Sequence, residues 1–150
     1  YFYEKMSQRH HEYSRPTYDD RPHMSTYASN GYLVLMPDIV YDEGYPGSSA
    51  LDDVVASARA VIDAGYADPD RICLQGHSWG GYETSFILTQ TDMFACAESG
   101  APVSNMTSAY GGIRWGSGYS RMFQYEKTQI RIGGTLWEAK PEPAGRRVGA

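Results

Sequence analysis

The feature that most constrains this chain is the hexapeptide Gly-His-Ser-Trp-Gly-Gly at residues 76–81. A short, largely apolar run precedes it at residues 71–75, as is typical of a strand buried on both faces of a parallel sheet. Residues 82–90 lack proline and glycine, which favours a helix. A Gly-x-Ser-x-Gly sequence in this setting predicts a sharp turn that lifts the serine hydroxyl of Ser78 above the sheet. Glycines at positions 76 and 80 favour that turn because they let neighbouring atoms approach closely.

Further strands and helices are predicted on both sides of the hexapeptide. The run at residues 32–36 predicts a buried strand, residues 94–97 predict another, and residues 1–5 look like the end of a third. Apolar residues recur at spacings of three and four over residues 51–62, which predicts an amphipathic helix ending at Gly65. Strand, helix and strand in succession form a right-handed unit with parallel strands. The expected fold is therefore α/β, a partial doubly wound and mostly parallel sheet of the α/β-hydrolase type, with a nucleophile elbow.

Composition and missing motifs exclude several other classes of protein. The net charge of −5 and the scattered basic residues argue against a nucleic-acid partner, and the apolar runs are too short for a membrane span. The chain has no phosphate-binding glycine loop, and His11 has Arg15 four residues later instead of a second zinc-binding histidine. No metal and no cofactor are expected. Because the first residue is Tyr1, any leader lies outside this sequence and the localisation is unknown.

The two cysteines fall in predicted strands. Cys73 and Cys96 are expected to serve as small buried apolar residues, the commonest role of a strand cysteine. A bridge between them is the alternative, if their strands are adjacent and the compartment is oxidising. Catalysis by cysteine is not expected.

All four histidines precede the serine. A serine nucleophile needs a base, and in α/β-hydrolases the order along the chain is Ser, Asp, His. Here His10, His11, His23 and His77 all come before Ser78, so that order is not completed. His77 is expected to be a structural residue of the elbow, because neighbouring side chains diverge there. One of the three earlier histidines is the alternative base, in a chain order foreign to the motif.

Four blocks resemble, in order, the catalytic domain of the prolyl oligopeptidase family. They are residues 30–38, residues 65–72, residues 76–82 and residues 101–104. That family includes dipeptidyl peptidases and acylaminoacyl peptidases, and the chain resembles a glutamyl endopeptidase-like or uncharacterised bacterial branch more closely than the dipeptidyl peptidases. The resemblance implies a serine peptidase that cleaves peptides through an acyl-enzyme. An acyl esterase with the same elbow is the alternative, as is a catalytically inactive fragment.

The resemblance assigns roles to individual residues. Ser78 would be the acylated nucleophile, with the Trp79 backbone amide and the Tyr3 hydroxyl as oxyanion donors. Tyr3 is followed by Glu4 and Lys5 where the family has glycines, so a half-buried strand tyrosine is its alternative reading. Residues 105–115 resemble the region that helps to form the pocket for the residue before the scissile bond. The candidates there are Met106, Tyr110, Ile113 and Trp115.

The resemblance also implies a domain organisation. Residues 1–138 match the N-terminal portion of the catalytic domain, and the triad aspartate and histidine would follow in later sequence. Residues 139–150 resemble nothing in the family and are expected to be an unstructured tail, the product of a truncation or a change of reading frame. The full-length protein is expected to carry an N-terminal β-propeller domain and to act on a peptide substrate.

Overall fold

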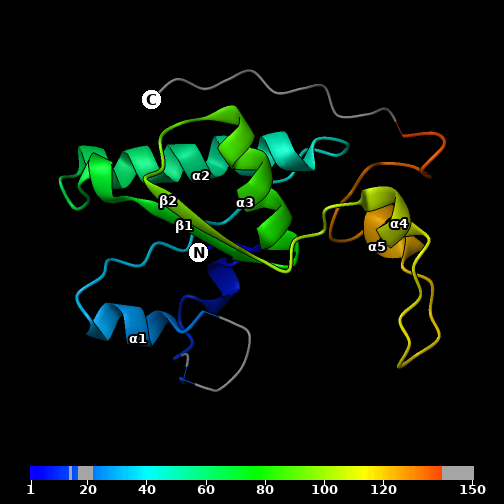
Figure 1. Ribbon diagram of the computed structural model, residues 1–150, viewed down its shortest axis with the longest axis horizontal. Helices are drawn as coiled ribbons and strands as arrows, with labels where there is room; N and C mark the ends of the chain where they lie inside the picture. The colour runs from blue at the N-terminus through cyan, green and yellow to red at the C-terminus, as the bar shows by residue number, and fades with distance from the viewer. Residues whose placement is uncertain (14, 17–21, 140–150) are drawn as a thin grey trace.

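The computed structural model in Figure 1 describes residues 1–13, 15–16 and 22–139. Its elements, in chain order, are a 3-10 helix η1 (Ser7–Arg9), α1 (Met24–Ser29), α2 (Pro46–Asp63), a 3-10 helix η2 (Pro69–Arg71), β1 (Cys73–His77), α3 (Trp79–Gln90), β2 (Cys96–Gly100), α4 (Met106–Tyr110) and α5 (Met122–Glu126). Of the tail predicted at residues 139–150, residues 140–150 lie outside the described part.

The centre of the molecule is a parallel pair of strands joined by a helix. β1 pairs with β2 in register, with Leu74 opposite Ala97, and α3 connects the two. α3 packs against both strands, and α2 packs against α3 (Figure 1). On the other side of the strands in this view lies α1, where the Tyr27 hydroxyl accepts a hydrogen bond from the Gln75 amide at 3.4 Å. The predicted parallel α/β unit is confirmed for these two strands.

The predicted amphipathic helix over residues 51–62 is confirmed. α2 buries Leu51, Val54 and Val55 in the main core, together with Leu74 of β1 and Ile87 of α3. The helix begins earlier than predicted, at Pro46, because proline suits the first turn of a helix. Gly65, two residues beyond the helix, has φ +75°, as predicted for the residue that ends it.

The strands predicted over residues 1–5 and 32–36 are wrong. The two described strands are β1 and β2 alone, although single hydrogen bonds place the first residues beside both segments: the Tyr1 nitrogen donates to Leu35 O at 2.9 Å, and the Phe2 amide donates to Gln75 O at 3.4 Å. Residues 32 and 33 are 65% and 62% exposed instead of buried. The strand predicted at 94–97 is observed at 96–100, and the helix predicted from residue 82 begins at 79.

The cysteines are not buried. Cys73 and Cys96 lie opposite each other across β1 and β2, both are exposed, and they form a disulfide. The expected role as small core residues is therefore wrong. The alternative prediction, a disulfide between adjacent strands, is what the structure has.

Candidate active site

Ser78 occupies a strained turn between β1 and α3. Its φ of 58° and ψ of −106° lie in a region that residues with side chains rarely adopt. The Ser78 amide donates to the Gly100 carbonyl at the end of β2 at 2.7 Å, and the Ser78 carbonyl accepts from the Tyr82 amide at 3.1 Å. These bonds tie the turn to β2 and to the first turn of α3.

Close backbone contacts explain the glycines around Ser78. A Cβ atom at Gly76 would overlap the Gly80 carbonyl oxygen, and one at Gly80 would overlap the Phe2 carbonyl oxygen. At Gly81 it would lie 2.7 Å from the Gly100 carbonyl oxygen. The predicted need for close approach at positions 76 and 80 is confirmed, and position 81 shares it.

The elbow lies at the carboxyl end of the sheet. Both strands run in the same direction, and from this end the chain turns into α3 on one side and leads from β2 towards α4 and α5 on the other (Figure 1). Ligands of parallel α/β sheets bind at the carboxyl ends of strands. The half-buried Ser78 therefore occupies the position at which such sheets present reactive groups.

A buried hydrogen-bond chain supports the first turn of α3. Trp79 is 1% exposed and stacks on Tyr82 with ring centroids 4.7 Å apart. Its indole nitrogen donates to the Tyr41 hydroxyl at 3.1 Å, and that hydroxyl donates to Glu83 Oε1. Glu83 is fully buried, and its Oε2 has no hydrogen-bond partner among the described residues. These hydrogen bonds join Trp79, the residue after Ser78, to a loop far away in the sequence.

Burial sets the charge state of the carboxyl group in this series of hydrogen bonds. Loss of hydration raises the pKa of Glu83 well above its ordinary value of 4.5, so the fold favours the protonated carboxyl. Burial, together with the charge that Glu83 carries when ionised, also raises the pKa of Tyr41. The Arg131 guanidinium lies 5.0 Å from the centre of the Tyr41 ring, and it pairs with Glu4 at 2.5 Å. Sequence reasoning missed these residues, because no local pattern marks a buried glutamate in a helix.

Tyr3 lies beside the elbow. Its Cα would be 3.4 Å from a Cβ atom on Gly80, and its carbonyl oxygen lies 3.4 Å from the Tyr41 hydroxyl oxygen. The half-buried side chain packs against the cluster that contains Trp79 and Tyr110. The structure thus brings Tyr3 next to the turn.

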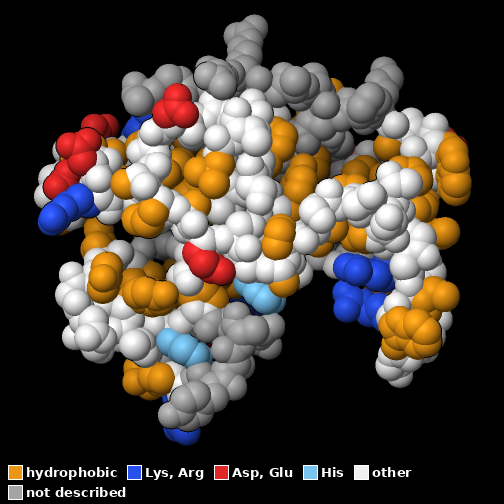
Figure 2. All heavy atoms as spheres, in the orientation of Figure 1, with side chains coloured by type: hydrophobic (Ala, Val, Ile, Leu, Met, Phe, Trp, Pro, Cys, Tyr) orange, Lys and Arg blue, Asp and Glu red, His pale blue; other side chains and the backbone are white. Residues whose placement is uncertain are grey.

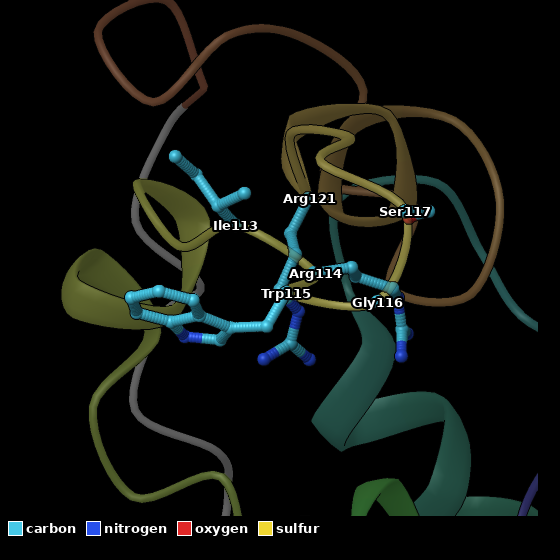
Figure 3. Close-up of a pocket in the computed structure, with 6 residues that line it drawn as sticks. All are labelled: Ile113, Arg114, Trp115, Gly116, Ser117 and Arg121. Carbon is cyan, nitrogen blue, oxygen red and sulfur yellow. The ribbon is translucent and has the colours of Figure 1, made fainter.

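The four residues predicted to line a substrate pocket fall into two groups. Tyr110 is 3% exposed and packs with Met106 in the cluster around Trp79, where its hydroxyl donates to Glu126. Ile113 and Trp115 are instead 60% and 98% exposed, on a loop closed by the antiparallel bridge between residues 113 and 120. That loop borders an open depression of about 470 Å³ (Figure 3), lined by Ile113, Arg114, Trp115, Gly116, Ser117 and Arg121.

Two of the four histidines that precede Ser78 have defined neighbours. His10 Nε2 lies 2.9 Å from the Met36 carbonyl oxygen. The ring of His77 lies against Gly100 on β2, consistent with a structural residue of the elbow. Among the described residues no group of three or more metal-ligating side chains is found, and no helix is long and apolar enough to cross a membrane.

Comparison with known proteins identifies relatives of this chain. A family model described as "Prolyl oligopeptidase family" matches residues 18–131. The acylamino-acid-releasing enzyme of Arabidopsis thaliana is 38% identical over 69 residues, which are 45% of this chain and 9% of that protein. The human prolyl endopeptidase FAP is 37% identical over 60 residues, which are 39% of this chain and 8% of that protein. The uncharacterized peptidase YuxL of Bacillus subtilis is 27% identical over 126 residues, covering 76% of this chain and 19% of that protein. The chain thus spans a small part of the length of these relatives.

Proposed function

Because the chain belongs to the prolyl oligopeptidase family, we propose that it carries the nucleophile of a serine peptidase, with Ser78 as the attacking residue. The Ser78 hydroxyl attacks the carbonyl carbon of a peptide bond, the amine leaves, and water later releases the acyl group. The observation that carries the proposal is the backbone of Ser78, held at φ 58° and ψ −106° between β1 and α3. Strain of this kind is maintained where a surrounding structure needs a side chain in one direction.

Two donors near the turn suit the negative charge that develops on the carbonyl oxygen. The Trp79 backbone amide is at the N-terminus of α3, where the helix dipole favours negative charge. Tyr3 is the proposed second donor, through its hydroxyl, and the contact between its backbone and Gly80 supports this role. Removal of one such donor costs about a hundredfold to a thousandfold in turnover.

The substrate side chain would lie on the α4–α5 side of the elbow. We assign Met106 and Tyr110 to the inner wall of that pocket, because they pack with Trp79, and Ile113 and Trp115 to its exposed rim. A peptide substrate agrees with the family and with the peptidase names of the relatives.

The base and the orienting acid are proposed to come from further sequence of the same protein. No histidine follows Ser78 in this chain, and the three relatives above are much longer than the stretch they share with it. Residues 1–138 are then the N-terminal portion of an α/β-hydrolase catalytic domain, in a protein that also carries an N-terminal β-propeller. In subtilisin, a different serine protease, loss of the catalytic histidine alone costs on the order of a millionfold in turnover.

Covalent labelling by a fluorophosphonate probe tests the proposal. Labelling read by intact mass and peptide mapping should fall on Ser78, in this chain or in a longer protein that contains it. Ser78→Ala should abolish the label, whereas the matched control Ser108→Ala, on α4, should retain it. Absence of the label on Ser78 in a longer, folded protein that contains a downstream histidine would refute the proposal.

A further inference from the structure

Two arginines share the open depression on the loop at residues 112–121. Figure 3 shows the guanidinium groups of Arg114 and Arg121 directed to the same side of this loop, with the Trp115 indole beside them. Arg114 NH2 donates to Gln124 Oε1 at 2.8 Å, which orients that guanidinium. Figure 2 shows basic side chains along a hollow between the part that contains α4 and α5 and the rest of the molecule. The hollow therefore has a positively charged wall.

Two buried donors in this region lack acceptors among the described residues. Among the described residues neither arginine is paired with a carboxylate, and no acidic residue lines the depression. Arg121 Nε and the Tyr125 hydroxyl are buried without a hydrogen-bond partner. Buried donors without acceptors cost free energy.

Both positive charges act on the same buried hydroxyl. The Arg121 guanidinium carbon lies 5.7 Å from the centre of the Tyr125 ring. Burial raises the pKa of Tyr125, and the charges of Arg121 and Arg114 oppose that rise. The two guanidinium groups thus lie close to one point, although the chain as a whole has a net charge of −5.

We propose that this depression binds a carboxylate of a peptide, held by Arg114 and Arg121 with the Trp115 indole against the neighbouring part of the ligand. Guanidinium groups bind carboxylates through paired, charge-assisted hydrogen bonds, and arginine suits such recognition better than lysine. The carboxylate belongs either to an acidic side chain or to the C-terminus of the peptide. That the ligand is a peptide rests on the proposed function, whereas the anion-binding chemistry does not.

Binding is measured on the Ser78→Ala chain, so that the result does not depend on the nucleophile. The probes are acetyl-Ala-Glu-Ala-amide, acetyl-Ala-Gln-Ala-amide and acetyl-Ala-Gln-Ala with a free terminal carboxylate, titrated by calorimetry and followed by tryptophan fluorescence. We expect at least one carboxylate probe to bind about tenfold more tightly than the neutral one. Higher salt concentration should reduce that difference.

Substitutions at the two arginines locate the effect. Arg114→Gln, at an exposed position, should lower the affinity for the carboxylate probes until it is close to that for the neutral probe. Arg121→Lys should lower the affinity for the carboxylate probes several-fold, because lysine lacks the planar guanidinium that binds both carboxylate oxygens. Arg71→Gln is the matched control: its side chain is 83% exposed in η2, and its loss should leave the difference unchanged. Circular dichroism spectra and melting curves of each variant verify that it folds.

The outcomes separate the two sources of the carboxylate and the two proposals. Tighter binding of acetyl-Ala-Glu-Ala-amide would show that the site binds an acidic side chain. Tighter binding of the probe with the free terminal carboxylate would show that it binds the C-terminus of a peptide. Equal affinities for all three probes, no binding of any, or a preference that survives Arg114→Gln would overturn the carboxylate site. Failure of fluorophosphonate labelling, with the carboxylate preference intact, would instead remove the peptidase proposal and leave the site.

Discussion

The indole nitrogen of Trp79 donates to the hydroxyl of Tyr41 across 3.1 Å, between residues 38 positions apart in the chain. The same hydroxyl donates a hydrogen bond to Glu83, which lies one turn further along α3. The loop before α2 is thereby joined to the first turn of the helix that follows Ser78. The position of the turn consequently depends on groups that take no part in the chemistry proposed for it.

Tyr41→Phe should destabilise the fold. It leaves the Trp79 indole and one Glu83 oxygen without their shared partner, in a region that water does not reach, so we expect the free energy of unfolding to fall by about 2–3 kcal/mol. Urea denaturation measures the change. Tyr66→Phe, at a side chain that is 75% exposed, should change stability by less than about 0.5 kcal/mol. Equal effects of the two substitutions would contradict the role of the buried hydroxyl.

Glu83→Gln should alter how stability depends on pH. The pKa of Glu83 is higher in the fold than its ordinary 4.5, so its contribution to stability is complete below about pH 4.5 and is lost as pH rises through the folded-state value. Glutamine has no such proton to lose. The variant should therefore gain stability relative to the natural chain as pH is raised from 4 to 8, measured by urea denaturation at each pH. A difference that stays flat over that range would contradict burial of an ionisable carboxyl.

Gly76→Ala should disrupt the elbow. The added methyl group would overlap the Gly80 carbonyl oxygen, which is backbone and has no side-chain freedom with which to move away. We expect a loss of about 3 kcal/mol or more in the free energy of unfolding. Gly116→Ala is the control, because nothing lies within 4 Å of its added carbon, and its stability should change little. The close backbone approach would be refuted if both alanines were tolerated alike.

Ser78→Gly should be more stable than Ser78→Ala. Both remove the hydroxyl, but only glycine adopts a positive φ without strain, and Ser78 has φ 58°. The expected difference in the free energy of unfolding is about 1–2 kcal/mol in favour of glycine. Thermal melting of the two variants compares them directly. If alanine proved the more stable, the turn would not be strained in the way described.

The disulfide between Cys73 and Cys96 should stabilise the oxidised chain. It closes a loop with a sequence separation of 23, for which the reduced entropy of the unfolded chain corresponds to about 3 kcal/mol. Replacement of both cysteines by serine should remove that stability and abolish any dependence of the melting temperature on reductant. Peptide mapping without reductant should find the two cysteines linked. Free thiols in protein refolded under oxidising conditions would argue against the bridge.

Local signals in the sequence predicted the parts that local chemistry decides. The apolar spacing in residues 51–62 indicated α2, and Gly65 indicated its end. The Gly-x-Ser-x-Gly sequence indicated the turn at Ser78, because a tight approach of backbone to backbone restricts which residues fit. These expectations required no knowledge of distant partners.

Pairing between distant segments was not predictable in the same way. Residues 32–36 are largely apolar, yet a strand also needs a neighbouring segment that offers repeated hydrogen bonds. The bond described between this segment and the start of the chain is the single one from the Tyr1 nitrogen to Leu35 O. Glu83 resembles an ordinary exposed helical residue until Tyr41 is brought to it by the fold. Arg114 and Arg121 form a shared surface because the loop between them turns back on itself.

The covalent link between Cys73 and Cys96 encloses β1, Ser78 and α3 in a single ring of the chain. A protease that cuts once between these cysteines would open the ring without releasing either half of the molecule. The nicked chain would migrate as one band on a gel run without reductant and as two bands after reduction. The segment that bears the serine would thus stay joined to the other half of the molecule through the disulfide.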